Sequence, residues 1–206
     1  MSPSVPLDSC LAVLDSKRMH TFARHAPLDV TPFDDPGEDR SGPPLSRGSL
    51  FTLLGTVAGE ALPPEAHAAI RRLDANTWYH GQLLETLLNM IEDYDPEMPE
   101  FVGRNIYFMF RGQLEQVGIA GATAIVKALT PTWIFVTRGD SGEMRSRMVS
   151  ERHWIIEAEQ PYNCLFEGGS FRGFIEAFDG HDVKIEHLTC RRNGDPFCTY
   201  DVRWEE

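Results

Sequence analysis

Three of the four cysteines in this chain fall within the last 43 of its 206 residues, and this clustering constrains the fold more than any other feature. The three are Cys164, Cys190 and Cys198, whereas Cys10 stands alone near the beginning. The first thirty residues lack the basic-then-apolar pattern of a secretory signal, and no stretch reaches the roughly 18 to 20 apolar residues of a membrane span. We therefore expect a cytoplasmic protein, in which disulfides are disfavoured and either a metal or coincidence explains the clustering.

The end of the chain has the pattern of a β-hairpin. Residues 183–189 and 198–204 alternate apolar and polar positions, as strands with one buried face do. Alternate side chains share a face of a strand, so His187 and Cys198 should both point inward near Cys190, where the connecting loop begins. The hairpin therefore brings three metal-binding side chains together.

A fourth side chain can join them from the preceding helix. The sequence predicts this helix over residues 163–178, with Asn163 as its cap and Cys164 as its first residue. If the helix lies across that end of the hairpin, three thiolates and one imidazole form a closed tetrahedral set, which suits structural zinc. The alternative is that the cysteines are small buried side chains and His187 is a hydrogen-bonded core residue.

The rest of the chain has helical spacing first and strands afterwards. Helices are expected over residues 66–73, 81–94, from 99 onward, and over 121–129. A strand is expected over residues 133–137, forming a hairpin with 144–157. This order predicts an α+β fold, with helices packed on an antiparallel sheet and a C-terminal β-hairpin that carries the metal site.

The proline-rich N-terminal part has a different texture. Residues 1–48 are too poor in hydrophobic side chains to offset the entropy of ordering them, so we expect a flexible arm before a folded domain over 49–206. A short helix over 11–25 could dock on the chain's own core or on a protein partner. The net charge of −12 predicts a surface that repels nucleic acid.

The C-terminal motifs resemble a known family. The run from Cys164 to Phe174, CLFEGGSFRGF, is followed by EHLTC ending at Cys190 and by NGDPFCTY ending at Tyr200. Together these segments are similar to the end of the 4-vinyl-reductase domain, the family that includes the sensory domains of phenol-responsive transcription activators. The motifs cover roughly residues 150 to 204, and from about Leu50 onward the pattern of apolar and polar residues is more weakly similar.

The resemblance implies a zinc site, a fold and a ligand. In those sensors three cysteines and an acidic residue bind zinc; the cysteines match Cys164, Cys190 and Cys198, while the acidic position is His187, with Glu186 as a neighbour that could act instead. The fold, shared with trafficking-complex (TRAPP-like) subunits, is α+β and often forms a homodimer. An apolar pocket beside the zinc would hold a small hydrophobic or aromatic ligand.

Several aromatic side chains are candidates to line such a pocket, although most aromatic residues at these spacings belong to the core. The segment around Trp154 loosely resembles the tryptophan-bearing strand of the sensors. The full set of candidates is Trp154, Trp133, Phe135, Tyr107 and Phe110. His80, which precedes a predicted helix, is interpreted as a capping or surface residue in preference to a base or haem ligand.

Three functions are compatible with these patterns. The leading one is a sensory or regulatory module that binds a small apolar ligand near structural zinc and signals through a dimer or a partner protein. The second is a non-catalytic scaffold with a filled core, and the third, suggested by the family's name alone, is an enzyme or accessory factor of tetrapyrrole reduction. No phosphate-binding loop or catalytic motif supports an enzyme, so we expect none.

Overall fold

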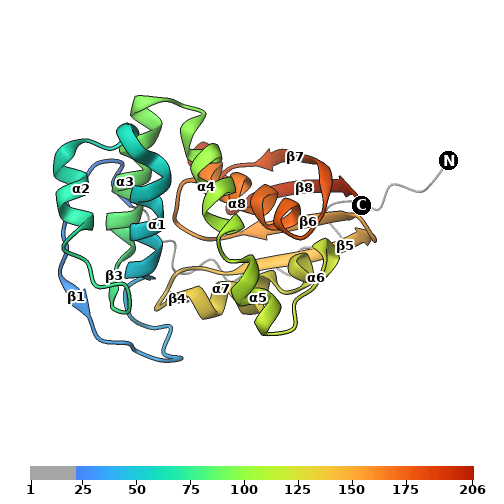
Figure 1. The fold of residues 1–206 in the computed structure, drawn as a ribbon, viewed down its shortest axis with the longest axis horizontal. Coiled ribbons are helices and arrows are strands. Elements are labelled where there is room, and N and C mark those ends of the chain that lie inside the picture. Colours follow the sequence, from blue (N-terminus) through green and yellow to red (C-terminus); the bar gives the residue numbers. More distant parts are fainter. Residues whose placement is uncertain (1–21) are drawn as a thin grey trace.

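The computed structural model describes residues 22–206, apart from the side chain of Phe135, and shows an α+β fold with two antiparallel sheets (Figure 1). The helices are α1 (Gly48–Ala58), η2 (Gly59–Ala61), α2 (Pro64–Ile70), α3 (Gly81–Tyr94), α4 (Met98–Phe108), α5 (Arg111–Gln116), α6 (Ala122–Lys127), α7 (Leu129–Val136), α8 (Cys164–Ala177) and η3 (Arg191–Asn193). The strands are β1 (Pro32–Phe33), β2 (Leu45–Arg47), β3 (Trp78–His80), β4 (Thr137–Arg138), β5 (Met144–Ser150), β6 (His153–Ala158), β7 (His181–Thr189) and β8 (Cys198–Glu205). No helix in this part of the chain is both long and apolar enough to cross a membrane.

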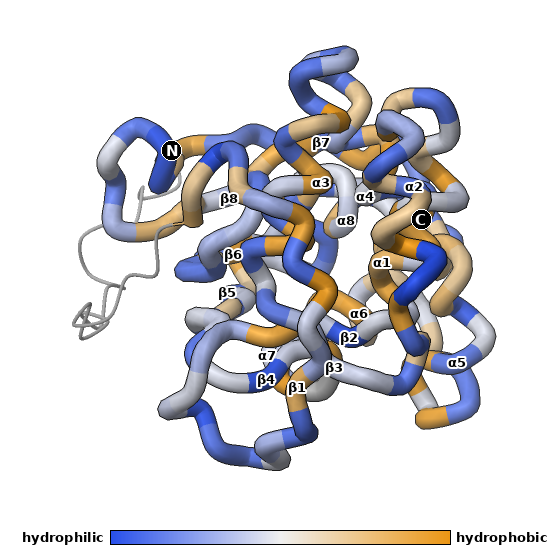
Figure 2. The backbone as a smooth tube through the Cα atoms, turned by 90° about the vertical axis from the view of Figure 1, so that its left-hand side faces the viewer, coloured by the Kyte–Doolittle hydropathy of each residue, from blue (hydrophilic) through white to orange (hydrophobic). Residues whose placement is uncertain are grey.

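The smaller sheet gathers short strands from distant parts of the sequence in the order β1-β3-β2-β4. Its β1 and β2 come from the segment that the sequence predicts to be a flexible arm, so residues 32–33 and 45–47 take part in the fold by pairing with β3. The loop between them is drawn mostly in the hydrophilic colour in Figure 2. Residues 1–21, which contain most of the predicted N-terminal helix, lie outside the described part, and the boundary at residue 48 stays a prediction.

The larger sheet has the order β5-β6-β8-β7, and α8 lies across it with α4 packed on α8 (Figure 1). Central β8 pairs with both β6 and β7, so that Tyr200 lies opposite Ile156 on one side and His187 on the other. The predicted C-terminal hairpin is therefore confirmed as β7 and β8. The hairpin predicted between residues 133–137 and 144–157 is wrong, because residues 144–157 divide into two strands, β5 and β6, which pair with each other.

Helices α4 and α8 approach each other through glycines. A Cβ atom on Gly103 would lie 2.1 Å from the carbonyl oxygen of Phe166, and one on Gly169 would lie 2.1 Å from that of Glu100. Gly173 meets the carbonyl oxygen of Arg104 in the same way, also at 2.1 Å. A side chain at any of these positions would force the helix axes apart, which explains the glycine-rich run in α8.

The leucine-rich helix α3 forms as its spacing predicts. Its apolar side chains Leu83, Leu84, Leu87, Leu88 and Ile91 are all buried. His80 caps its first turn by accepting a hydrogen bond from the backbone N–H of Gln82 at 3.1 Å, and this confirms the capping interpretation of that histidine.

The prediction of a strand over residues 133–137 is wrong. The segment forms α7 instead, and only Thr137 and Arg138 are extended, as β4. A short apolar run can occupy either a buried strand or a buried helix, so periodicity does not separate the two. Tertiary contacts favour the helix here, because Trp133 is buried and its indole N–H donates to the carbonyl oxygen of Gly142 at 3.1 Å.

Candidate functional site

Three cysteines and one histidine converge where the C-terminal hairpin meets the start of α8. Cys164 begins α8, His187 belongs to β7, Cys190 follows β7, and Cys198 begins β8. One ligand atom from each of these four residues lies within 4.8 Å of the others. We refer to Cys164, His187, Cys190 and Cys198 as the Cys3His cluster.

Local hydrogen bonds fix the backbone on both sides of the cluster. The side-chain oxygen of Asn163 caps α8 by accepting from the N–H groups of Leu165 and Phe166, at 3.0 and 3.2 Å. In the hairpin loop the N–H of Cys190 donates to a carboxylate oxygen of Asp195 at 2.8 Å. These hydrogen bonds shape the start of α8 and the hairpin loop separately, and none of them joins the one to the other.

The spacing of the donor atoms suits a tetrahedral metal ion. The sulfur atoms of Cys164 and Cys190 are 3.6 Å apart, close to the roughly 3.8 Å expected for two thiolates that each lie about 2.3 Å from one zinc ion. The Nε2 atom of His187 is buried and has no hydrogen-bond partner among the described residues. A buried ring nitrogen without a partner is costly, and one of the two ring nitrogens of His187 lies within 4.8 Å of the three sulfur atoms.

Tyr200 supports the cluster from the neighbouring strand. Its ring stacks on the imidazole of His187, with centroids 4.5 Å apart and planes 7° from parallel, and its hydroxyl donates to the carbonyl oxygen of Cys164 at 2.8 Å. One side chain therefore orients two members of the cluster. The hydroxyl is desolvated by burial, which raises its pKa above the usual range.

The cluster favours a thiolate at Cys198. Hydrogen bonding with Cys164, helped by His187 and by the backbone N–H of Arg191, lowers the pKa of the Cys198 thiol to about 4. The same hydrogen bond, together with burial, raises the pKa of Cys164. Thiolates are the form of cysteine that binds metal.

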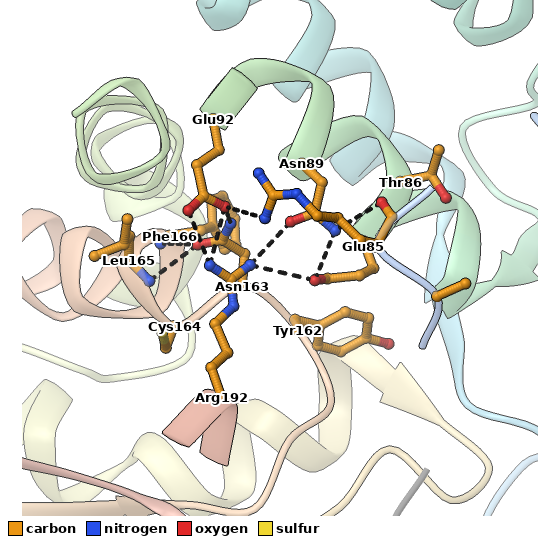
Figure 3. A network of polar contacts seen from close by, with 12 residues as sticks. Glu85, Thr86, Asn89, Glu92, Tyr162, Asn163, Cys164, Leu165, Phe166 and Arg192 are labelled. Carbon is orange, nitrogen blue, oxygen red and sulfur yellow. Dashed lines mark hydrogen bonds and ion pairs between the residues drawn. The ribbon is translucent and has the colours of Figure 1, made fainter. Parts of the chain in front are cut away.

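A polar network joins this region to α3 (Figure 3). The guanidinium of Arg192, two residues after Cys190, donates to both carboxylate oxygens of Glu92 at 3.0 and 2.9 Å and to the side-chain oxygen of Asn89 at 2.9 Å. The side-chain amide of Asn163 also donates to Glu92, at 2.8 Å. Asn163, which precedes Cys164, and Arg192, which follows Cys190 by two residues, thus both donate to the carboxylate of Glu92 on α3.

Two buried carboxyl groups lie near this network. Burial raises the pKa of Glu85, which is 7% exposed, to about 7, although Asn89 and Arg192 oppose the rise. Burial also raises the pKa of Glu167, which is 4% exposed, to about 8. Both side chains are therefore protonated to a substantial degree near neutral pH.

An apolar cavity of about 450 Å³ opens beside the second half of α8. It is bounded by α4, α5, α7 and α8, and its polar side chains are few. Phe174, on its wall, is ten residues after Cys164, which places it about 15 Å further along the same helix. The lining residues are Tyr107, Phe110, Gln113, Leu114, Val117, Ile119, Ala128, Pro131, Thr132, Val136 and Phe174.

The candidate ligand-lining residues divide between this cavity and the core. Tyr107 and Phe110 both line it, with ring centroids 5.8 Å apart. Trp133 and Trp154 are buried elsewhere, and the indole N–H of Trp154 donates to the carbonyl oxygen of Glu151 at 3.2 Å. The side chain of Phe135 lies outside the described part of the structure.

The network on α3 is the feature that sequence reasoning missed. Glu85, Asn89 and Glu92 recur at i, i+4 and i+7, which is a polar stripe on a helix whose other face is leucine-rich. That spacing is visible in the sequence. Their partner Arg192 lies 100 residues or more away, and no local pattern points to it.

Comparison with known proteins gives structural likeness alone. No family model matches the chain, and no curated protein matches it. An H-NOX protein from S. oneidensis in the Fe(II)NO ligation state superposes with a TM-score of 0.55 at 15% identity, covering 78% of this chain and 99% of that one. An oxygen-binding H-NOX domain related to soluble guanylate cyclases gives a TM-score of 0.52 at 12% identity, with 77% and 93% covered.

A weaker likeness concerns a trafficking protein particle complex subunit 3 from Naegleria fowleri, covalently bound to palmitic acid. Its TM-score is 0.43 at 15% identity, over 57% of this chain and 87% of that one, which is too low to establish a shared fold. The H-NOX superpositions span most of both chains, and at these identities they establish architecture. The chain therefore has the α+β fold of the H-NOX domains.

Proposed function

We propose that this protein is a non-catalytic sensory or regulatory module that binds a small apolar ligand and carries a structural zinc ion at the Cys3His cluster. The observation that carries the proposal is that one helix, α8, provides both a member of the cluster at its start and a wall of the apolar cavity further along. A ligand in the cavity and a metal at the cluster would both act on the same rigid element.

The fold supports a sensory role. H-NOX structures are described with nitric oxide, carbon monoxide or oxygen as ligands, and a fold shared with such domains is a reasonable scaffold for ligand sensing. The function itself rests on the site, since one fold serves many functions. In this proposal the output passes through a homodimer or a partner protein.

Haem does not fit this cavity. Another structure that superposes on this chain is described through its haem redox potential, and haem iron in proteins is held by histidine, cysteine, methionine or tyrosine. The described lining residues include no histidine, cysteine or methionine and no lysine or arginine, and the only possible ligand among them is the buried Tyr107. A neutral, mostly apolar molecule suits the lining better.

The metal part is tested by elemental analysis of protein purified without a metal-binding tag. We expect about one zinc per chain, as in a closed site with four protein ligands. Protein that contains no metal, and takes up none from a zinc solution, would remove the metal from the proposal and leave the cavity to be judged separately.

The cavity is tested with the neutral fluorescent probe N-phenyl-1-naphthylamine and two matched variants. Val136 lines the cavity, whereas Val149 is exposed on β5. Val136→Trp should fill the cavity and weaken probe binding at least tenfold, while Val149→Trp should bind like the unaltered protein. Equal binding by both variants would show that the probe sits elsewhere.

A filled core, which the scaffold alternative requires, does not agree with a cavity of this size. The tetrapyrrole alternative has no described cofactor site to support it. Purified protein that carries bound pigment would bring that alternative back.

A further inference from the structure

The structure points to a coupling that extends beyond the metal ion itself: we propose that Arg192 links occupancy of the Cys3His cluster to the docking of residues 22–25 on α3. This inference rests on the metal centre proposed above. It assigns to Arg192 and Asn163 the role of positioning residues 22–25 on α3. This role is separate from ligand binding in the cavity and from metal binding at the cluster.

The first arm of the link runs from the hairpin loop to α3. Arg192 stands two residues after Cys190 in the short helix η3, and its side chain leaves the loop to reach Glu92, Asn89 and Glu85. The guanidinium is one-third exposed, whereas the Glu92 side chain is 16% exposed and that of Glu85 is 9% exposed. The two carboxylates of this ion pair are therefore largely shielded from solvent, and salt screens their attraction to Arg192 only weakly.

The second arm runs from the start of α8 to the same carboxylate. Asn163 uses its oxygen to cap the helix that begins with Cys164 and its amide nitrogen to donate to Glu92 (Figure 3). A metal ion that holds Cys164 and Cys190 together would fix the backbone positions from which Asn163 and Arg192 extend. Both donors would then reach Glu92 at a smaller entropic cost.

The same part of α3 also binds residues 23 and 24, near the beginning of the part of the chain that the structure describes. The side-chain amide of Asn89 donates to the carbonyl oxygen of Arg24 at 3.0 Å, and the Arg24 guanidinium pairs with Glu92 at 3.4 Å and Asp93 at 2.5 Å. Nearer the start of α3, Gln82 exchanges two hydrogen bonds with the backbone of Ala23, both at 2.8 Å.

Asn89 and Glu92 are thus shared between the metal-binding region and residues 22–25. The amide nitrogen of Asn89 donates to Arg24 and also to Glu85, at 2.9 Å, while its oxygen accepts from Arg192. Without Arg192, that oxygen loses its donor and Glu85 loses a cation in a poorly solvated site, so we expect the stripe to rearrange although Arg24 keeps Glu92 and Asp93 as partners. The expected result is release of residues 22–25 from α3.

The test is amide exchange measured by NMR on the full chain, with zinc and after removal of zinc by a chelator. The reporter is the N–H of Ala23, which donates to Gln82. The reference is the N–H of Thr31, which donates locally to Asp29 at 2.9 Å. In the unaltered protein we expect zinc removal to speed exchange at Ala23 at least tenfold and to leave Thr31 unchanged.

Two variants separate coupling from general damage. Arg192→Gln should keep one zinc per chain and yet exchange rapidly at Ala23 whether zinc is present or not. Arg104→Gln breaks an ion pair with Glu176 between α4 and α8, outside the network, and should behave like the unaltered protein. Cleavage by trypsin between Arg24 and His25 gives a second readout and should follow the exchange rate.

The outcomes are distinguishable from failure of the metal proposal. If zinc binds and is removed but Ala23 exchanges at the same rate, the coupling is overturned and the metal centre stands. If Arg192→Gln with bound zinc protects Ala23 like the unaltered protein, Arg192 is not the link. If the protein takes up no zinc, both proposals fall together, whatever Ala23 does.

Discussion

The sulfur atoms of Cys164 and Cys190 lie 3.6 Å apart, although the two residues are 26 positions apart in the chain, with Cys164 at the start of α8 and Cys190 just after β7. This proximity depends on α8 crossing the end of the hairpin, because neither element alone brings the two thiols together. It has a direct consequence for stability if a metal joins them.

Replacement of Cys190 by serine should remove the metal and destabilise the protein strongly. Structural zinc contributes a folding free energy on the order of 10 kcal/mol in small zinc-dependent domains, and part of that contribution should be lost here. We expect a clear fall in melting temperature, measured by calorimetry beside zinc content. Cys10→Ser is the matched control, since Cys10 stands far from the cluster in sequence. An unaltered melting temperature in Cys190→Ser would argue that the cluster is ordinary core.

The tandem glycines in α8 allow a test of helix packing. Gly169→Ala would place a methyl group 2.1 Å from the carbonyl oxygen of Glu100, so α4 and α8 must separate. Overpacking of this kind costs about 1 to 3 kcal/mol, and more where backbone is the obstacle. Gly168→Ala meets nothing closer than a Tyr200 ring atom at 3.6 Å, and it should be neutral or stabilising by up to about 1 kcal/mol through helix propensity.

Urea denaturation of both glycine variants measures this difference. The expected order of unfolding free energies is Gly168→Ala at or above the unaltered protein and Gly169→Ala well below it. Equal effects at the two positions would contradict the close approach of α4 and α8.

Much of this architecture could be predicted from sequence because its signals are local. The leucine spacing of α3, the Asn163 cap of α8 and the alternation in β7 and β8 each reflect neighbours within a few residues, and the structure confirms all four elements. The alternation and the cap together also placed the four members of the Cys3His cluster near one another, while their role as zinc ligands stays a prediction.

The elements that sequence analysis missed depend on distant contacts. The strand β2 exists because Ser46 lies between Tyr79 and Thr137, residues that no local pattern connects to it. The helix α7 replaces a predicted strand because burial of Trp133 decides between two conformations that an apolar run permits equally. Arg192 contacts Glu92 on α3, a residue 100 positions earlier in the chain, and only the folded structure brings the two side chains together.

The buried Glu167 predicts an unusual pH dependence of stability. Burial raises its pKa in the folded state to about 8, from an ordinary value of 4.5. Between these two values the folded state holds a proton that the unfolded state has lost, so stability is lost as the pH rises through this window. The slope for one group is at most about 1.4 kcal/mol per pH unit.

Glu167→Gln should remove this contribution, because a buried amide has no proton to lose. Relative to the unaltered protein, the variant should become more stable by about 1 kcal/mol for each pH unit between roughly 5.5 and 7.5. Urea denaturation of both proteins at these two pH values gives the difference, in which the pH dependence of metal binding cancels provided both carry the same zinc content. Parallel curves would mean that Glu167 is already ionised in the folded protein, and that an unrecognised cation or solvent path compensates its charge.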